Sequence, residues 1–343
     1  MNRRDKVLKL IVEYFIKTAE PVGSKTLIEE YGLDYSSATI RSEMNALEQA
    51  GFLEKLHTSG GRVPSSKGYR YYIENLRERS VSDEFKHQMQ TILDEKIQSI
   101  DKVIQNSCEI LSQMTSLASI VLGPNVKEEK LVSVQIIPIS ETSATCVFVT
   151  DQGYVENKTF MFSEEIKPED VKACVTLLND RLKGTSISEL IPKMKAIKPL
   201  LNDYVIDHDV IYQAMLEAFL GFAKDRFDAY GKDVLLDQPE FQNDAAKIRK
   251  ILALFENPDA FRHNDSEEEI SIHIGGENND DDDLSIISAK VKIPGQKEGS
   301  IAIVGPKRMD YDQVVSSMEY LINELEKRFS NRKESKGERK ENK

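Results

Sequence analysis

One segment of the chain, residues 36–72, joins an amphipathic helix to a basic hairpin with two adjacent glycines, and it constrains the fold more than any other feature. Ser36 is placed to cap a helix, and the apolar residues that follow recur at i, i+4 and i+7. These residues are Ile40, Met44 and Leu47. One stripe of the helix must therefore pack against a core, which leaves the opposite stripe available to a partner.

The opposite stripe carries short or hydrogen-bonding side chains. At about 100° per residue, they fall roughly 100° to 200° around the helix from Ile40. The residues are Ala38, Arg41, Ser42 and Asn45. Side chains of these types reach base edges in a DNA groove, so we interpret this segment as a recognition helix.

The neighbouring segments follow in the order expected of a winged helix-turn-helix. Residues 3–18 have apolar residues at helical spacing, and Ser24 is placed to cap a shorter helix over 25–31. Gly51 supplies a stop after the recognition helix, and a short strand and the wing at 57–63 come next.

Basic charge is concentrated in the wing and the residues after it. The whole chain has a net charge of −12, whereas residues 1–80 hold 13 Lys and Arg against 11 Asp and Glu, and residues 55–72 hold no carboxylate. Gly60 and Gly61 permit positive φ at the wing tip, which would place the Arg62 guanidinium in a minor groove or on phosphates. The predicted DNA-binding residues are Ser37, Ala38, Thr39, Arg41, Ser42, Asn45, His57, Thr58, Ser59, Arg62, Lys67 and Arg70.

An alternative is that the winged helix is a protein-protein module, because such folds host several functions. An interaction module does not require a carboxylate-free basic wing beside a polar helix face, so we favour DNA binding. A single winged helix covers one half-site, whereas a twofold dimer reads a palindrome; this predicts a homodimer.

Helices and strands alternate in the remainder of the chain. The periodicity predicts one long helix over 82–118, either a dimer helix or, as we favour, a helix packed within its own chain. β-branched runs predict three antiparallel strands within 131–162, and further strands at 270–274, 284–293 and 300–304. Helical patterns fall between these two sets of strands (168–178, 187–194, 197–201, 210–230 and 244–255), and a last one covers 311–328. This order predicts an α+β domain split by a helical insertion.

Two runs of the sequence resemble the HrcA family of bacterial heat-inducible transcription repressors. They are ATIRSEMNALEQAGFLEKLHTSGGRVPSSKGYRYYI near the start and GSIAIVGPKRMDYDQVVSSMEYLINEL near the end. The resemblance implies repression of chaperone operons through an inverted-repeat operator of the CIRCE type, with a GroE-type chaperonin as a partner that keeps the repressor active. It also implies a GAF-like sensor domain interrupted by a dimerisation domain.

These features predict three domains. Residues 1–80 are assigned to the winged helix, residues 81–165 and 238–343 to the GAF-like domain, and residues 166–237 to the inserted dimerisation domain. The alternative function is that of a ligand-sensing or adaptor protein in which the winged helix contacts protein.

Sequence signals for other chemistry are weak. Residues 275–283 combine two glycines with five carboxylates, but their spacing is not that of an EF-hand, and contiguous Asp usually marks a solvated loop. The five histidines are scattered, and the three cysteines lack a CxxC pair. No apolar run approaches the ~18 residues of a membrane span. We therefore expect a cytoplasmic protein, associated with the nucleoid when bound to its operator, that is not an enzyme and has neither cofactor nor metal.

Overall fold

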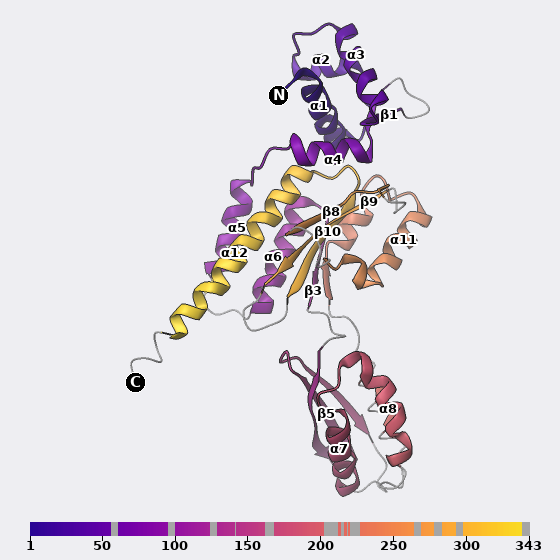
Figure 1. Cartoon of the computed structure of the whole chain (residues 1–343), viewed down its shortest axis with the longest axis vertical. Coiled ribbons are helices and arrows are strands. Elements are labelled where there is room, and N and C mark those ends of the chain that lie inside the picture. Colours follow the sequence, from indigo (N-terminus) through magenta and orange to yellow (C-terminus); the bar gives the residue numbers. More distant parts are fainter. Residues whose placement is uncertain are drawn as a thin grey trace. The chain divides into compact units, whose positions relative to one another are not determined.

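The computed structural model describes residues 1–55, 61–94, 100–123, 129–140, 142–161, 168–201, 212–213, 216–217, 219, 227–263, 269–277, 283–292 and 298–337. The fold combines helices with antiparallel sheets, as the α+β prediction requires (Figure 1). It divides into two compact units. The first comprises residues 1–122, 227–294 and 300–343, and the second comprises residues 123–226 and 295–299.

The N-terminal part of the first unit contains three helices and a short hairpin. The helices are α1 (Arg3–Thr18), α2 (Ser24–Tyr31) and α3 (Ser37–Gln49). Strands β1 (Leu53–Glu54) and β2 (Val63–Pro64) pair in antiparallel register, and α4 (Ser66–Asn75) follows. The predicted helices and hairpin are thus present, although Gly23 rather than Ser24 occupies the N-cap of α2.

Glycines fix the chain at two places around this hairpin. Gly51 has a φ of +79°, which ends α3 as predicted. Gly61 has no left-handed φ; instead, a Cβ at this position would lie 2.8 Å from the Pro21 side chain. The sequence prediction for Gly61 was therefore wrong in its reason, because close backbone approach rather than positive φ requires glycine there.

A five-stranded sheet forms the centre of the first unit, in the order β7-β3-β10-β9-β8. Its strands are β3 (Ala118–Leu122), β7 (Phe227–Tyr230), β8 (Ile270–His273), β9 (Leu284–Val291) and β10 (Gly299–Pro306). Residues 118 and 227–230 were predicted to be helical but lie in β3 and β7. These two short segments have no alternating hydrophobic pattern, so their extended conformation depends on the pairing of β3 with β7 on one side and with β10 on the other.

Helices cover both faces of this sheet. Ile301 and Ile303 of β10 pack with α5 (Asp83–Asp94), α6 (Ile100–Thr115) and α12 (Tyr311–Gly337), and this core continues into the N-terminal helices. Ala302 and Val304 face the other core, with α10 (Lys232–Leu236), α11 (Ala245–Phe255) and the short 3₁₀ helix Pro258–Phe261. Because successive side chains of β10 point to opposite faces of the sheet, this strand contributes residues to both cores.

The single helix predicted over 82–118 is instead two helices, α5 and α6, that pack against each other and against α12. The periodic apolar stripe was correct, because Phe85, Met89, Cys108 and Leu111 are all buried. Folding the two helices together buries both stripes in one core, which confirms intramolecular packing as the favoured interpretation.

The second unit contains a three-stranded sheet, β4 (Leu131–Ser140), β5 (Ser143–Thr150) and β6 (Val155–Met161), in sequential order. Its core is formed by one face of β5, with Ala144, Cys146 and Phe148, together with α7 (Pro168–Leu182) and α8 (Ile187–Leu201). The three strands were predicted correctly.

Their place in the fold differs from the predicted division. We expected β4, β5 and β6 to belong with the later strands, but they form their own sheet in the second unit. Burial explains this difference, because α7 and α8 complete a hydrophobic core with these strands alone. Much of the helix predicted over 210–230 lies outside the described residues.

Candidate nucleic-acid interface

Helix α3 is oriented by its apolar stripe. Ile40, Met44 and Leu47 are buried in the core of the first unit. At the start of the helix, the Ser36 hydroxyl accepts a hydrogen bond from the Thr39 backbone N–H at 3.1 Å, as predicted for an N-cap. The Ser37 hydroxyl pairs with that of Ser24 at 2.8 Å, which ties α3 to α2.

The face opposite the apolar stripe is open. Ala38, Arg41, Ser42 and Asn45 are all exposed. These are the four side chains that the helical geometry places together, and they form one exposed strip of short or hydrogen-bonding side chains along α3. Ser37 and Thr39 at its beginning are partly buried and serve the capping contacts just described.

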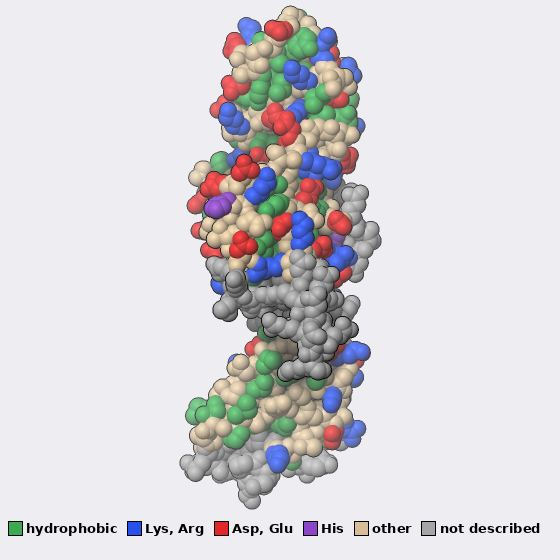
Figure 2. All heavy atoms as spheres, turned by 90° about the vertical axis from the view of Figure 1, so that its left-hand side faces the viewer, with side chains coloured by type: hydrophobic (Ala, Val, Ile, Leu, Met, Phe, Trp, Pro, Cys, Tyr) green, Lys and Arg blue, Asp and Glu red, His purple; other side chains and the backbone are tan. Residues whose placement is uncertain are grey.

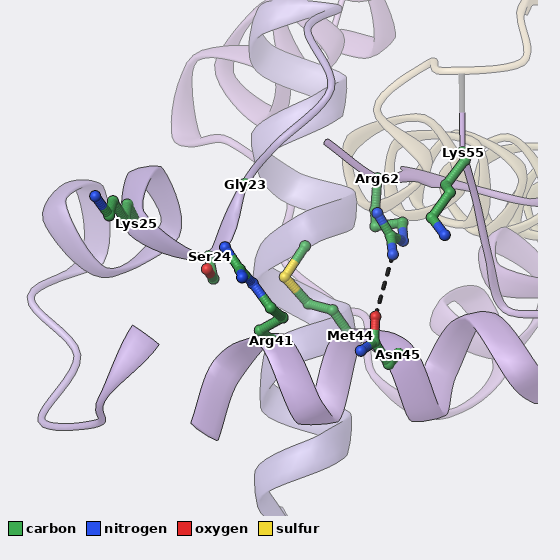
Figure 3. A pocket seen from close by; sticks show the side chains of 8 residues that line it. All are labelled: Gly23, Ser24, Lys25, Arg41, Met44, Asn45, Lys55 and Arg62. Carbon is green, nitrogen blue, oxygen red and sulfur yellow. Dashed lines mark hydrogen bonds between the residues drawn. The ribbon is translucent and has the colours of Figure 1, made fainter. Parts of the chain in front are cut away.

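A pocket of about 490 Å³ lies beside this strip, between α2, α3 and the hairpin (Figure 3). It is lined by Gly23, Ser24, Lys25, Arg41, Met44, Asn45, Lys55 and Arg62. Four of these eight residues are cationic, and the lining contains no carboxylate. Such a concave cationic surface attracts an anion such as a phosphodiester.

Arg62 does not extend outward as the sequence predicts. Its side chain is buried and turned toward α3, where Nε and Nη2 donate to Glu48 Oε2 at 2.7 and 2.6 Å. Nη2 also donates to Asn45 Oδ1 at 3.1 Å, as the dashed line in Figure 3 shows. The backbone of Arg62 pairs with that of Val22, which fixes the chain at the base of the hairpin.

Glu48 is paired with two of the cations that line the pocket, Lys55 and Arg62. Desolvation acts to raise its pKa, but hydrogen bonds from Lys55 and Arg62 outweigh that effect and lower the pKa. Glu48 is therefore ionised at neutral pH, with Lys55 at 3.2 Å and Arg62 at 2.6 Å. Its negative charge is balanced locally, which reduces repulsion of an approaching phosphate.

The structure places Lys67 and Arg70 away from the α3 strip. Lys67 Nζ donates to the Ala50 carbonyl at 2.9 Å and lies 4.7 Å from the centre of the Phe52 ring. Arg70 donates to Glu277 and to the Ile272 carbonyl, both in the later part of the first unit. The predicted residues His57, Thr58 and Ser59 lie outside the described residues.

Sequence reasoning missed Lys25, whose exposed side chain joins the strip from α2. The sequence held a signal for this position, because Lys25 is the second residue of α2, which precedes α3 by one short turn. The sequence did not predict that the first residues of α2 and α3 lie close together, as the hydrogen bond between the Ser24 and Ser37 hydroxyls shows.

The described residues do not form a metal site or a membrane-spanning helix. Within the described ranges, no group of three His, Cys, Asp or Glu side chains is placed to hold a metal ion. Asp280–Asp282 of the predicted acidic loop lie outside those ranges, and Asp283 accepts a hydrogen bond from Lys247. Every helix in the described part of the chain is too short or too polar to cross a membrane.

These features define an α+β protein with an exposed polar helix face and a cationic pocket, as in the regulators that contact DNA. Residues 101–315 match the family described as HrcA protein C terminal domain. The chain belongs to the HrcA family of heat-inducible transcription repressors.

Two relatives named heat-inducible transcription repressor HrcA resemble this chain over nearly its full length. The protein of Halalkalibacterium halodurans is 39% identical over 332 residues, which cover 95% of this chain and 96% of the relative. The protein of Bacillus pumilus is 39% identical over 337 residues, which cover 96% of this chain and 98% of the relative.

A crystal structure of a hypothetical protein at 2.2 Å resolution has a similar fold. The TM-score is 0.65 at 24% sequence identity, with 96% of this chain and 99% of the other covered. Both relatives are named as transcription repressors.

Proposed function

We propose that this protein represses chaperone operons by binding an inverted-repeat operator of the CIRCE type through helix α3. The observation that carries the proposal is the exposed strip of Ala38, Arg41, Ser42 and Asn45 beside a cationic pocket. In this proposal, residues 1–80 act as a winged helix, α3 enters the major groove, and the hairpin follows the backbone.

The cations around the strip have separate roles in this arrangement. Arg41 is exposed within the strip and can donate in bidentate fashion to a guanine edge. Lys25 and Lys55 are exposed at the sides of the pocket and can contact phosphates. The hydroxyl of Ser42 and the methyl of Ala38 add contacts of the types that DNA readers use.

We further propose that two copies of the chain associate through the second unit. One face of its sheet exposes hydrophobic side chains, and Figure 2 shows such side chains gathered on this unit. The most exposed are Val132, Ile137, Ile139, Val155 and Met161. An exposed apolar patch of this kind is typical of a protein interface, and a twofold dimer would present two α3 helices to two half-sites.

The dimer proposal predicts the effect of a charge in the patch. Ile137 is 52% exposed, so Ile137→Asp should leave the fold of the second unit intact while placing a carboxylate in the interface. Sedimentation should show a monomer, and operator affinity should fall toward that of a single module. Thr176→Asp adds the same charge at an exposed position of α7, which packs against the other face of the sheet, and as the matched control it should leave the dimer and the operator affinity unchanged.

We propose that the five-stranded-sheet part of the first unit acts as the GAF-like domain and the second unit as the inserted dimerisation domain. Together they would hold the two winged helices at the half-site spacing, and a GroE-type chaperonin would maintain that folded state. Heating would then release the operator, and free chaperonin would restore binding. Such a repressor acts in the bacterial cytoplasm, on the nucleoid.

A mobility-shift titration tests the proposal. Purified full-length protein is titrated onto an inverted-repeat chaperone operator and onto a scrambled duplex, with and without chaperonin, over a series of salt concentrations. We expect a specific shift that chaperonin strengthens. Equal binding to both duplexes in every condition would refute the proposal and favour the ligand-sensing or adaptor alternative.

Arg41→Ala gives a sharper form of this test. We expect a loss of about 1–3 kcal/mol on the operator together with relaxed base preference at one position, as for a direct base contact. Lys17→Ala is the matched control, because Lys17 is an exposed cation near the end of α1 and does not line the pocket. Equal losses on operator and scrambled DNA would contradict base reading by Arg41.

A further inference from the structure

We propose that Asn45 reads a hydrogen-bond acceptor on a base edge through its amide nitrogen, and that Arg62 is the positioning residue that fixes the amide in this orientation. This inference rests on the proposed function, since it concerns how helix α3 would select bases. It assigns Arg62 a role that differs from the phosphate or minor-groove contact predicted from sequence.

The orientation of the Asn45 amide follows from its partner. Arg62 Nη2 lies 3.1 Å from Asn45 Oδ1. A guanidinium has five N–H donors and no acceptor, so the Asn45 atom that faces it must be the carbonyl oxygen. The amide nitrogen is then directed to the other side, and Asn45 is exposed on the same strip as Arg41 (Figure 3).

Arg62 is held firmly enough to set this orientation. Its side chain is only 9% exposed, and two of its nitrogens donate to Glu48 Oε2 at 2.7 and 2.6 Å. Its backbone N–H and C=O both pair with Val22, at 2.9 and 3.0 Å. To extend toward a phosphate, the guanidinium would have to give up its ion pair with Glu48 and its hydrogen bond to Asn45.

This geometry restricts the bases that Asn45 can select. In the major groove, purine N7, guanine O6 and thymine O4 are acceptors, whereas the edge of cytosine presents an amino donor. An amide whose oxygen is engaged by Arg62 and whose nitrogen faces the groove favours the acceptors. The chain should therefore discriminate against cytosine at the base that Asn45 faces.

Substitution with aspartate separates the two ends of the amide. Asn45→Asp keeps an oxygen for Arg62 and so retains the contact that holds the hairpin, but it removes the N–H donors. Every base pair of one half-site is replaced in turn, and the affinities of wild-type protein, Asn45→Asp and Asn45→Ala are compared. Base preference is measured as the ratio of one protein's affinities for two duplexes. The general repulsion of DNA by the new carboxylate affects both affinities and therefore cancels.

We expect wild-type protein to show one position per half-site at which cytosine costs about fivefold to tenfold, the value of one hydrogen bond. Both Asn45 variants should lose the preference there and retain it elsewhere. If Asn45→Asp retains the preference while Asn45→Ala loses it, the oxygen reads the base and the proposal is wrong. If neither variant alters any preference, Asn45 reads no base and the proposal is also wrong.

Arg62→Gln tests the positioning role, with Lys17→Gln as a matched loss of one cation. We expect Arg62→Gln to flatten the same single position. Glu48→Gln is added to Arg62→Gln so that no carboxylate is left without its cation, and this double variant should keep the affinity for scrambled DNA and the salt dependence of wild-type protein. Weaker binding to every duplex, with a salt slope reduced by about one, would instead show a phosphate contact and overturn this role. Should Arg62→Gln fail to fold, Arg62→Lys replaces it: a lysine keeps a charge beside Glu48 but lacks the planar fork that reaches Glu48 and Asn45 together, so the same single position should flatten.

The controls separate this inference from the function on which it rests. If wild-type protein shows no preference for the operator over scrambled DNA, the proposed function fails and this inference fails with it. If wild-type protein prefers the operator and the Asn45 variants have wild-type base preferences, only the inference fails.

Discussion

The contact between Arg70 and Glu277 leads to a prediction about how the N-terminal helices are joined to the sheet of the first unit. Arg70 Nε and Nη2 donate to the two oxygens of Glu277 at 3.1 and 2.5 Å, and Nη2 also donates to the Ile272 carbonyl at 2.6 Å. Nearby, the Ser66 hydroxyl donates to the Gly275 carbonyl at 2.7 Å. Helix α4 is thus attached to the last residues of β8 and to those that follow it, within 272–277.

The strength of this contact follows from its partial burial. The side chains of Arg70 and Glu277 are 32% and 25% exposed, so the pair lies between an exposed one, worth 0–1 kcal/mol, and a buried one, whose disruption costs about 3–5 kcal/mol. Arg70→Met should therefore lower the free energy of unfolding by about 1–3 kcal/mol, consistent with loss of charged hydrogen bonds. Glu277 retains a hydrogen bond from the Ile274 N–H at 3.3 Å, which limits the loss.

A double-mutant cycle with Arg70→Met and Glu277→Gln, measured by urea unfolding, isolates the pair. We expect a coupling of about 1–2 kcal/mol, as for a charged, bidentate contact. The same cycle on Lys17 and Glu30, a pair 3.8 Å apart and 75% and 48% exposed, is the control and should give less than about 0.5 kcal/mol. Equal couplings in the two cycles would refute the argument that Arg70 joins α4 to the sheet.

Three further changes test the packing and the titratable groups. Gly68→Ala would bring a Cβ to 2.1 Å from the Phe52 carbonyl oxygen, so we expect a loss of about 1–3 kcal/mol by urea unfolding; an unchanged midpoint would contradict the close approach. Burial raises the pKa of Asp312, so the folded state disfavours its ionised form. Asp312→Asn should therefore have a higher free energy of unfolding than wild type at pH 7, and this difference should shrink as the pH falls through the raised pKa. A difference in the free energy of unfolding between Asp312→Asn and wild type that stays constant from pH 7 to pH 4 would contradict this prediction. Burial raises the pKa of Cys108 and of Cys146 to about 12, so iodoacetamide at pH 8 should label neither thiol until urea is added; labelling of the native protein would contradict their burial.

The features of the N-terminal region that could be predicted from sequence are those set by local periodicity. The apolar stripe of α3, the Ser36 cap and the stop at Gly51 all appear in the structure. Each depends on residues within one or two helical turns, where spacing and backbone preference act directly. The exposure of Arg41 and Asn45 follows from the same periodicity.

Features set by contacts distant in sequence were not predictable in this way. The stripe over 82–118 is equally compatible with one helix or with two that pack on each other, because either arrangement buries the same residues. Strands β3 and β7 are more than 100 residues apart and become extended by pairing with each other. Likewise, the sequence cannot show that β4, β5 and β6 complete a core with α7 and α8 rather than with β8, β9 and β10.

The cations of residues 55–72 show why composition alone overstates a DNA-binding surface. The segment holds four cations and no carboxylate, yet Arg62 and Lys55 meet Glu48 from the preceding helix, and Arg70 meets Glu277 from 207 residues away. In the free protein, nearby carboxylates partly balance the charge of these cations. The excess positive potential therefore comes from cations on α2 and α3, such as Lys25 and Arg41. Salt dependence should accordingly reflect fewer phosphate contacts than the basic segment suggests, while Arg62 contributes by orienting Asn45.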